Sequence, residues 1–195
     1  PLARVVGMLL WAWLVWMAGS NGIPFNKVTI GISLGIVACL GAWQAWCQRV
    51  SLKEEWGSRW KLFLFLELLF LAFFLFDLLI RIGNPDLWHP SKGGERPMNF
   101  TQLNAVLRST IFPPYDAWYS GGYINYYYSG DVIVGTPVKL LGIVPSIAFN
   151  FILPTLYAVM GLGTFSIGYN LIKPRINEKV RWSWKNDLFS LVAGL

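Results

Sequence analysis

Charged side chains are scarce in this chain of 195 residues. Asp, Glu, Lys and Arg together make up 13% of it, against about 25% in a typical soluble domain. Apolar residues make up 55%, and the mean hydropathy is +0.48. So few charged groups cannot cover a water-soluble surface, and the composition therefore indicates an integral membrane protein.

Histidine and cysteine are also scarce, with one His and two Cys in the whole chain. A zinc site needs several such ligands at fixed spacings, and His89 has no such neighbours in the sequence. Cys39 and Cys47 are two helical turns apart on one predicted helix, too far for a disulfide bond. These absences exclude a zinc site and an intrahelical bridge.

The basic residues are confined to short stretches, although the net charge is +6. A nucleic-acid-binding protein would spread them as a patch along one face, so nucleic acid is excluded as a partner. Clusters of Lys and Arg between apolar runs instead follow the rule that such loops stay in the cytoplasm. By that rule, the connections 48–61 and 173–186 are predicted to be cytoplasmic.

Long apolar runs dominate the rest of the chain, and about 20 apolar residues suffice to cross a bilayer. They predict an all-α, polytopic transmembrane protein that forms one helical membrane domain over residues 1–195. The chain starts at Pro1 and stops inside an apolar run, which predicts a fragment of a longer protein. The predicted spans are 2–18, 28–47, 62–82 and 146–172, with the start of another at 188.

The segment 131–144 is apolar but too short to cross, since it covers about 21 Å as a helix. It also contains Pro137 and Lys139. We therefore predict that it lies in the membrane interface. Both basic connections then fall on the cytoplasmic side, and the long loop 83–130 is predicted to be external.

This loop holds the polar chemistry of the chain. Helical spacing over Met98–Ser109 predicts a short surface helix, with Glu95 just before its start. Glu95 could serve function, or merely favour the positive end of that helix. Oxygens of Asp86, Glu95 and Asp116 would suit Mg²⁺, but their spacing does not require a metal, so the cofactor is unassigned.

Tyrosine and tryptophan crowd the second half of the loop, from Tyr115 to Tyr128. Such rings collect at membrane interfaces, but they also stack on sugar rings while their polar tips bind hydroxyl groups. The two interpretations are equally favoured for any single ring.

Two acids lie inside the predicted span 62–82. Asp77 has Arg81 four residues later, which predicts an ion pair on one helix face. Glu67 is predicted either to be neutral or to face another helix that is missing from this fragment. Glycines of the span 146–172 are predicted to allow close helix contacts; they are Gly161, Gly163 and Gly168.

Two stretches of the loop are distinctive. They read N-P-D-L-W-H-P-S-K-G-G-E-R-P-M-N-F-T-Q-L-N-A-V-L-R-S and F-P-P-Y-D-A-W-Y-S-G-G-Y-I-N-Y-Y-Y-S-G. The chain thereby resembles the bacterial and archaeal YYY membrane protein family, the DUF2298 group. The resemblance is good from about Leu62 to Asn170 and looser over the first two helices. Family members are several times longer than this chain.

That family is similar to the GT-C class of membrane glycosyltransferases, which take sugars from polyprenyl-phosphate donors. The resemblance implies a GT-C-like fold and sugar transfer at the external face of the plasma (inner) membrane. Glu95 would be the general base, and Lys92, Arg96 or Arg108 would meet the donor phosphate. The other residues assigned to substrate are Asp86, His89, Asn104, Asp116, Asn125, Tyr126, Tyr127 and Tyr128; for His89 a local structural hydrogen bond is the alternative.

A non-catalytic membrane subunit within a larger assembly is the alternative function. The family pattern has Asp where this chain has Asn99, and Trp-rich helices would suit packing against other subunits. The partners expected are membrane lipid with a lipid-linked sugar donor or, for the alternative, other membrane subunits. A transporter or channel is disfavoured because the spans carry few polar residues to line a path.

Overall fold

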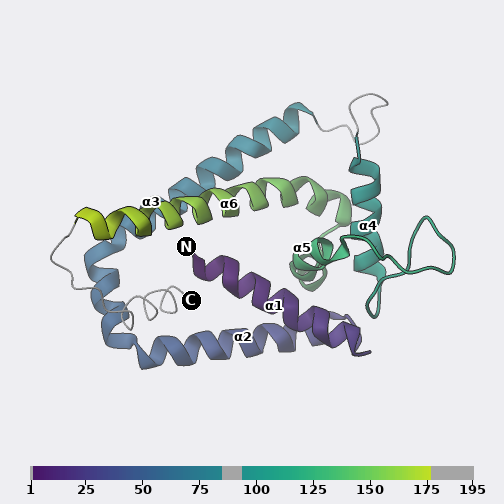
Figure 1. The fold of residues 1–195 in the computed structure, drawn as a ribbon, viewed down its shortest axis with the longest axis horizontal. Coiled ribbons are helices and arrows are strands. Elements are labelled where there is room, and N and C mark those ends of the chain that lie inside the picture. Colours follow the sequence, from purple (N-terminus) through teal and green to yellow (C-terminus); the bar gives the residue numbers. More distant parts are fainter. Residues whose placement is uncertain (1, 85–93, 177–195) are drawn as a thin grey trace. The chain divides into compact units, whose positions relative to one another are not determined.

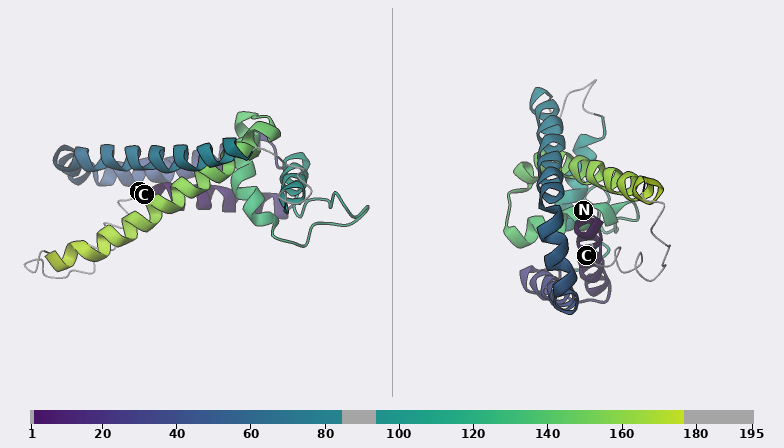
Figure 2. Two further views of the ribbon diagram at one scale, coloured as in Figure 1. Left: turned by 90° about the horizontal axis from the view of Figure 1, so that it is seen from above. Right: turned by 90° about the vertical axis from the view of Figure 1, so that its left-hand side faces the viewer.

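The computed structural model describes residues 2–84 and 94–176. Every regular element within these ranges is an α-helix (Figures 1 and 2), and four of them are long and apolar enough to cross a membrane. This confirms the all-α polytopic membrane fold. The four are α1 (Leu2–Ser20), α2 (Lys27–Cys47), α3 (Arg49–Gly83) and α6 (Pro145–Ile176), and the shorter helices are α4 (Arg96–Arg108) and α5 (Tyr128–Leu141).

Some predictions fall outside the described residues. They are the substrate roles of Asp86, His89 and Lys92, the helix start at 188, and the part of the connection 173–186 beyond Ile176.

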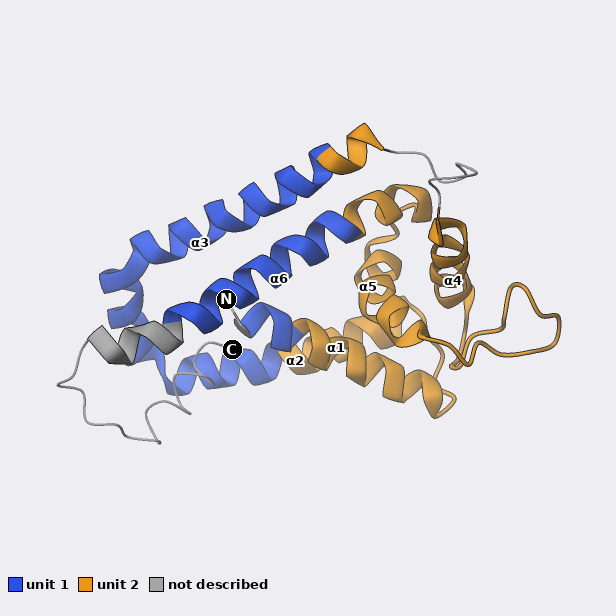
Figure 3. Ribbon diagram, turned by 45° about the horizontal axis from the view of Figure 1, so that its top comes forward, with its two compact units in different colours: residues 1–7, 38–79, 153–195 blue, residues 8–37, 80–152 orange. Residues whose placement is uncertain are grey.

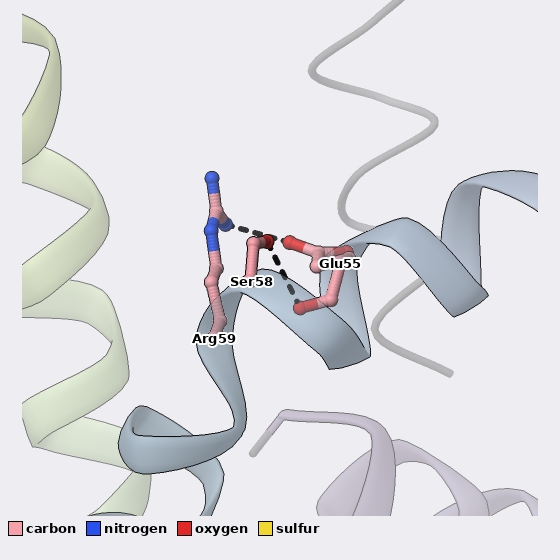
Figure 4. Close-up of polar contacts among 3 residues, drawn as sticks. All are labelled: Glu55, Ser58 and Arg59. Atoms are coloured by element: carbon pink, nitrogen blue, oxygen red, sulfur yellow. Dashed lines mark hydrogen bonds and ion pairs between the residues drawn. The ribbon is translucent and has the colours of Figure 1, made fainter.

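Helix α3 begins at Arg49, whereas the sequence predicted a connection over 48–61 and a span from Leu62. Arg59 has non-helical angles of φ −125° and ψ 18°, directly after the Gly57–Ser58 pair, and such pairs are a usual cause of kinks. Arg59 Nη1 donates to Glu55 Oε1 at 2.6 Å, and Ser58 Oγ donates to the Glu55 carbonyl oxygen at 3.2 Å (Figure 4). The predicted connection is thus helical from Arg49 and bends at Arg59 into the span.

The chain divides into two compact units (Figure 3). Unit 1 comprises residues 1–7, 38–79 and 153–195, and unit 2 comprises residues 8–37 and 80–152.

In unit 1, side chains of α6 contact side chains of α3. A Cβ atom on Gly161 would lie 2.6 Å from ring carbons of Phe73, so only glycine leaves room for that ring. Phe73 also packs edge-on against Tyr157, with ring centroids 5.7 Å apart. Gly161 thus makes the predicted close contact, whereas a Cβ atom on Gly163 or Gly168 would meet nothing within 4 Å.

Glu67 of unit 1, for which the sequence left two alternatives, forms an ion pair with Arg4. Arg4, in the first turns of α1, donates from Nη2 to Glu67 Oε1. Both side chains are about half exposed, at 54% and 55%. The pair with Arg4 of α1, which was not predicted, supplies Glu67 with a partner inside this chain.

Unit 2 has a buried apolar core on which the long connection after α4 is anchored. The Phe112 N–H donates to the Gly19 carbonyl oxygen at 3.1 Å, and a Cβ atom on Gly19 would lie 2.4 Å from the Phe112 ring. The Phe25 N–H likewise donates to the Thr110 carbonyl oxygen at 2.6 Å. The core cluster consists of Val15, Phe25, Ile30, Val106, Phe112 and Val132.

Candidate functional site

Glu95 directly precedes α4, as the sequence predicted, and Pro97 follows in the first turn of the helix. Its carbonyl oxygen accepts a hydrogen bond from the Asn99 N–H at 2.9 Å. Its side chain makes no capping hydrogen bond, and the residue is exposed. The carboxylate is therefore not used to start the helix and is open to a proton donor.

Two arginines converge on one backbone oxygen at the end of α3, and one of them, Arg96, directly follows Glu95 in the chain. Arg96 Nη1 donates to the Asn84 carbonyl oxygen at 3.2 Å, and Arg81 Nη1 donates to the same oxygen at 3.3 Å. Arg81 Nε also donates to Asn150 Oδ1 at 2.9 Å. Two guanidinium groups that share one carbonyl oxygen bring like charges close together, an arrangement that an anion would stabilise.

Arg81 lies in the last turn of α3, yet its side chain is buried and contacts an aromatic ring. It is only 8% exposed, and its guanidinium group lies 5.7 Å from the centroid of the Phe149 ring. That ring packs in turn against Phe100 of α4, with centroids 5.2 Å apart. The end of α3, the start of α4 and the start of α6 thus meet around one buried cation within unit 2.

The predicted Asp77–Arg81 ion pair is wrong, since no salt bridge joins the two in the part of the chain described. The spacing of four residues favoured a pair on one helix. The guanidinium group bonds instead to Asn84 and Asn150, one of which comes from a helix far along the chain. The place of Arg81 in the site could therefore not be predicted from its neighbours in the sequence.

The remaining predicted residues of α4 are not gathered around Glu95. Asn104 donates from Nδ2 to the Phe100 carbonyl oxygen of its own helix at 2.7 Å. Arg108 is exposed at the last residue of α4, which places it roughly 20 Å along the helix axis from Glu95. Arg108 is therefore too far along α4 to share one phosphate group with Arg96.

Asp116 lies in a hairpin-like turn between α4 and α5. Its Oδ1 accepts hydrogen bonds from the N–H groups of Trp118, at 2.8 Å, and Tyr119, at 3.3 Å. Tyr115 and Tyr123 pair across the turn with ring centroids 4.8 Å apart. The Tyr123 hydroxyl donates to that of Tyr115 at 3.5 Å, and this hydrogen bond raises the pKa of Tyr123. The Asp116 carboxylate has a local role in shaping the turn.

The other four predicted substrate residues come together in one pocket. This open pocket of about 450 Å³ is lined by Trp16, Asn125, Tyr126, Tyr127, Tyr128 and Ser129. Trp16 could not be found from the sequence, because it lies in α1, more than a hundred positions before Tyr128.

Two half-buried charges lie on α5 near these residues, and neither was predicted to act. Burial raises the pKa of the Asp131 carboxyl to about 6. Burial lowers the pKa of the Lys139 ammonium to about 8, although Nζ donates to the Ser109 carbonyl oxygen at 2.8 Å and lies 4.1 Å from the centroid of the Phe25 ring. In both cases, burial disfavours the charged form.

Comparison with known families gives one match. A family model described as an uncharacterized membrane protein (DUF2298) matches residues 10–195, nearly the whole chain. Searches of curated proteins and of solved structures found no match. The resemblance noted in the loop motifs is therefore confirmed at the level of this family.

Proposed function

Because the chain belongs to the DUF2298 family of membrane proteins, we propose that it is part of a GT-C-like glycosyltransferase. It transfers a sugar from a polyprenyl-phosphate donor to an acceptor hydroxyl. The transfer takes place at the external face of the plasma membrane, where the segment between α3 and α5 lies.

The observation that carries this proposal is that Glu95 directly precedes Arg96, whose guanidinium group converges with that of Arg81 on the Asn84 carbonyl oxygen. An exposed carboxylate can accept a proton, while Arg81 and Arg96 offer two positive charges for a phosphate group. Sugar transfer from a lipid phosphate needs both: a base for the attacking hydroxyl and positive charge for the phosphate that leaves.

The reaction follows from these two roles. Glu95 takes the proton of the acceptor hydroxyl as its oxygen attacks the anomeric carbon of the donor sugar. The bond between that carbon and the phosphate oxygen breaks, and its electron pair stays on the polyprenyl phosphate. Arg81 and Arg96 stabilise the added negative charge through charge-assisted hydrogen bonds in place of their present bonds to Asn84.

The placement at the external face rests on charge and length. The start of α3 carries Arg49, Lys53, Arg59 and Lys61, and such basic clusters stay in the cytoplasm. Helix α5 is not among the helices able to span, so the chain between α3 and α6 stays on one side, opposite to that cluster.

The alternative of a non-catalytic membrane subunit is supported by one feature of the helices. Several tryptophans of α1, α2 and α3 are at least half exposed, as subunit packing would require. They are Trp13, Trp43, Trp46, Trp56 and Trp60.

Replacing Glu95 tests the proposed transfer. The full protein and its Glu95→Gln variant are incubated with radiolabelled polyprenyl-phosphate hexoses in membranes, and labelled products are counted. We expect Glu95→Gln to lower the rate by about 10²- to 10⁴-fold, the usual contribution of a general base. Glu54→Gln, which changes another exposed glutamate, serves as the matched control and leaves the rate unchanged. Equal rates for both variants would rule out Glu95 as the base.

A further inference from the structure

We propose that the pocket at the start of α5 binds one ring of an extended, neutral saccharide, which is the acceptor of the proposed transfer. The inference rests on the proposed function for the acceptor role.

The back of the pocket is rigid and aromatic. Trp16 Nε1 donates to the Tyr128 hydroxyl at 3.1 Å, which fixes the orientation of both rings. Tyr128 stacks on Phe112, with centroids 6.1 Å apart, and Phe112 is only 5% exposed. A sugar would meet ring faces that are already in place, so little conformational entropy is lost when it binds.

The front of the pocket is exposed. Tyr127 is 77% exposed and Tyr126 is 54% exposed, and their rings are tilted by 58° with centroids 4.4 Å apart. Rings with open faces and phenol hydroxyls can stack on the C–H face of a sugar and bind its hydroxyls. The amide of Asn125 and the hydroxyl of Ser129 add further donors and acceptors.

The lining of the pocket favours a neutral ligand. None of its six residues carries a charge at neutral pH. A phosphate group would find no cation in this lining, in contrast to Arg81 and Arg96, which converge on the Asn84 carbonyl oxygen. The pocket is therefore suited to an uncharged sugar rather than to the donor phosphate.

The separation of the pocket from Glu95 sets the length of the ligand. Trp16 and Tyr128 pack on the core cluster that contains Val106, and Val106 lies roughly 16 Å along α4 from Glu95. A single sugar ring cannot reach from this pocket to the carboxylate. An acceptor that uses both must be a chain of several sugars, with its reacting end at Glu95.

Binding of defined sugars, measured without any donor, tests the inference. The probes are neutral gluco- and manno-oligosaccharides of one to six rings, titrated calorimetrically onto the full protein in lipid nanodiscs. We expect binding that strengthens with chain length and that Tyr127→Ala weakens roughly tenfold. Trp16→Phe, which keeps an aromatic ring but removes the N–H donor, should also weaken it.

The matched control is Tyr119→Ala. Tyr119 is 71% exposed in the neighbouring turn and does not line the pocket, so this variant should bind as the wild type does. No binding of any probe, or equal binding by the Tyr127 and Tyr119 variants, would overturn the saccharide site. That result would leave the rings as a membrane-interface belt. Binding of a single sugar as tightly as of the longer chains would overturn the extended acceptor.

The design separates this inference from the proposed transfer. If the saccharides bind but no sugar is transferred by any form of the protein, the transferase proposal fails and the binding site stands.

Discussion

The arginines of the two compact units are balanced in different ways. In unit 1, Arg4 pairs with Glu67 and Arg59 with Glu55, and all four side chains are at least 40% exposed. In unit 2, the buried Arg81 bonds only to neutral oxygens and a ring among the described residues. Exposed ion pairs contribute roughly 0–1 kcal/mol, so those of unit 1 matter little. A buried cation without a carboxylate, by contrast, is suited to recognise an anion.

Arg81→Gln is expected to have the largest effect, because it removes the buried charge that distinguishes unit 2 from unit 1. We expect the KM for the polyprenyl-phosphate donor to rise about 10- to 100-fold, which is the loss of a hydrogen bond to a charged group. Arg81→Lys should restore part of the affinity, because it keeps the charge but not the planar fork. The measurement is the initial transfer rate against donor concentration.

Arg59→Gln is the matched control for that experiment, since it removes an arginine already paired on an exposed surface. Its donor KM should equal that of the wild type. An equal rise in KM for the Arg59 and Arg81 variants would show that general positive charge matters, rather than the convergent pair.

Gly161→Ala tests the contact between Gly161 of α6 and Phe73 of α3 in unit 1. The added Cβ atom would lie 2.6 Å from Phe73, so we expect a loss of about 1–3 kcal/mol in the free energy of unfolding. Gly163→Ala meets nothing within 4 Å and should be neutral or slightly stabilising. Unfolding in mixed micelles measures both, and equal losses would contradict the close contact.

Asp131→Asn tests the second half-buried charge of unit 2. The folded pKa of about 6 lies above the unfolded value, so the folded state binds more protons between about pH 4 and pH 6. Ionisation above pH 6 therefore costs stability that acidification to pH 4 restores. We expect Asn to stabilise the protein by roughly 1–2 kcal/mol at pH 8, after allowance for solvent screening.

The pH dependence supplies the check on Asp131. The gain from Asp131→Asn should fall to a small fraction at pH 4, where the carboxyl of the wild type is protonated in the folded state and about half protonated in the unfolded state. Glu54→Gln, at an exposed position, should show no gain at either pH. A gain from Asn that is as large at pH 4 as at pH 8 would mean that desolvation of the charge is not its cause.

Arg59→Gln is expected to have the smallest effect on stability. An exposed pair of this spacing contributes about 0.3–0.5 kcal/mol, so the unfolding midpoint should barely move. A loss above about 1 kcal/mol would show that the pair with Glu55 sets the bend of α3, and it would weaken the contrast drawn between the two units.

The length of the apolar runs could predict the spanning helices, because a segment inside the bilayer must form its backbone hydrogen bonds within itself. The same rule could not predict the first turns of α3, because they are too polar to span a membrane. Lys and Glu occur in helices outside the bilayer as well as in loops, so their presence does not distinguish the two. The partners of Arg81 and the place of Trp16 in the pocket depend on residues distant in sequence. Spacing along one helix, on which the predicted Asp77 pair was based, contains no such information.

The most direct test of the account follows donor binding and transfer in the same sample of Glu95→Gln. The account predicts that this variant binds a polyprenyl-phosphate hexose as tightly as the wild type, through Arg81 and Arg96, and transfers its sugar at least 100-fold more slowly. Transfer at the wild-type rate with the donor bound would contradict the central claim that Glu95 is the base of this site.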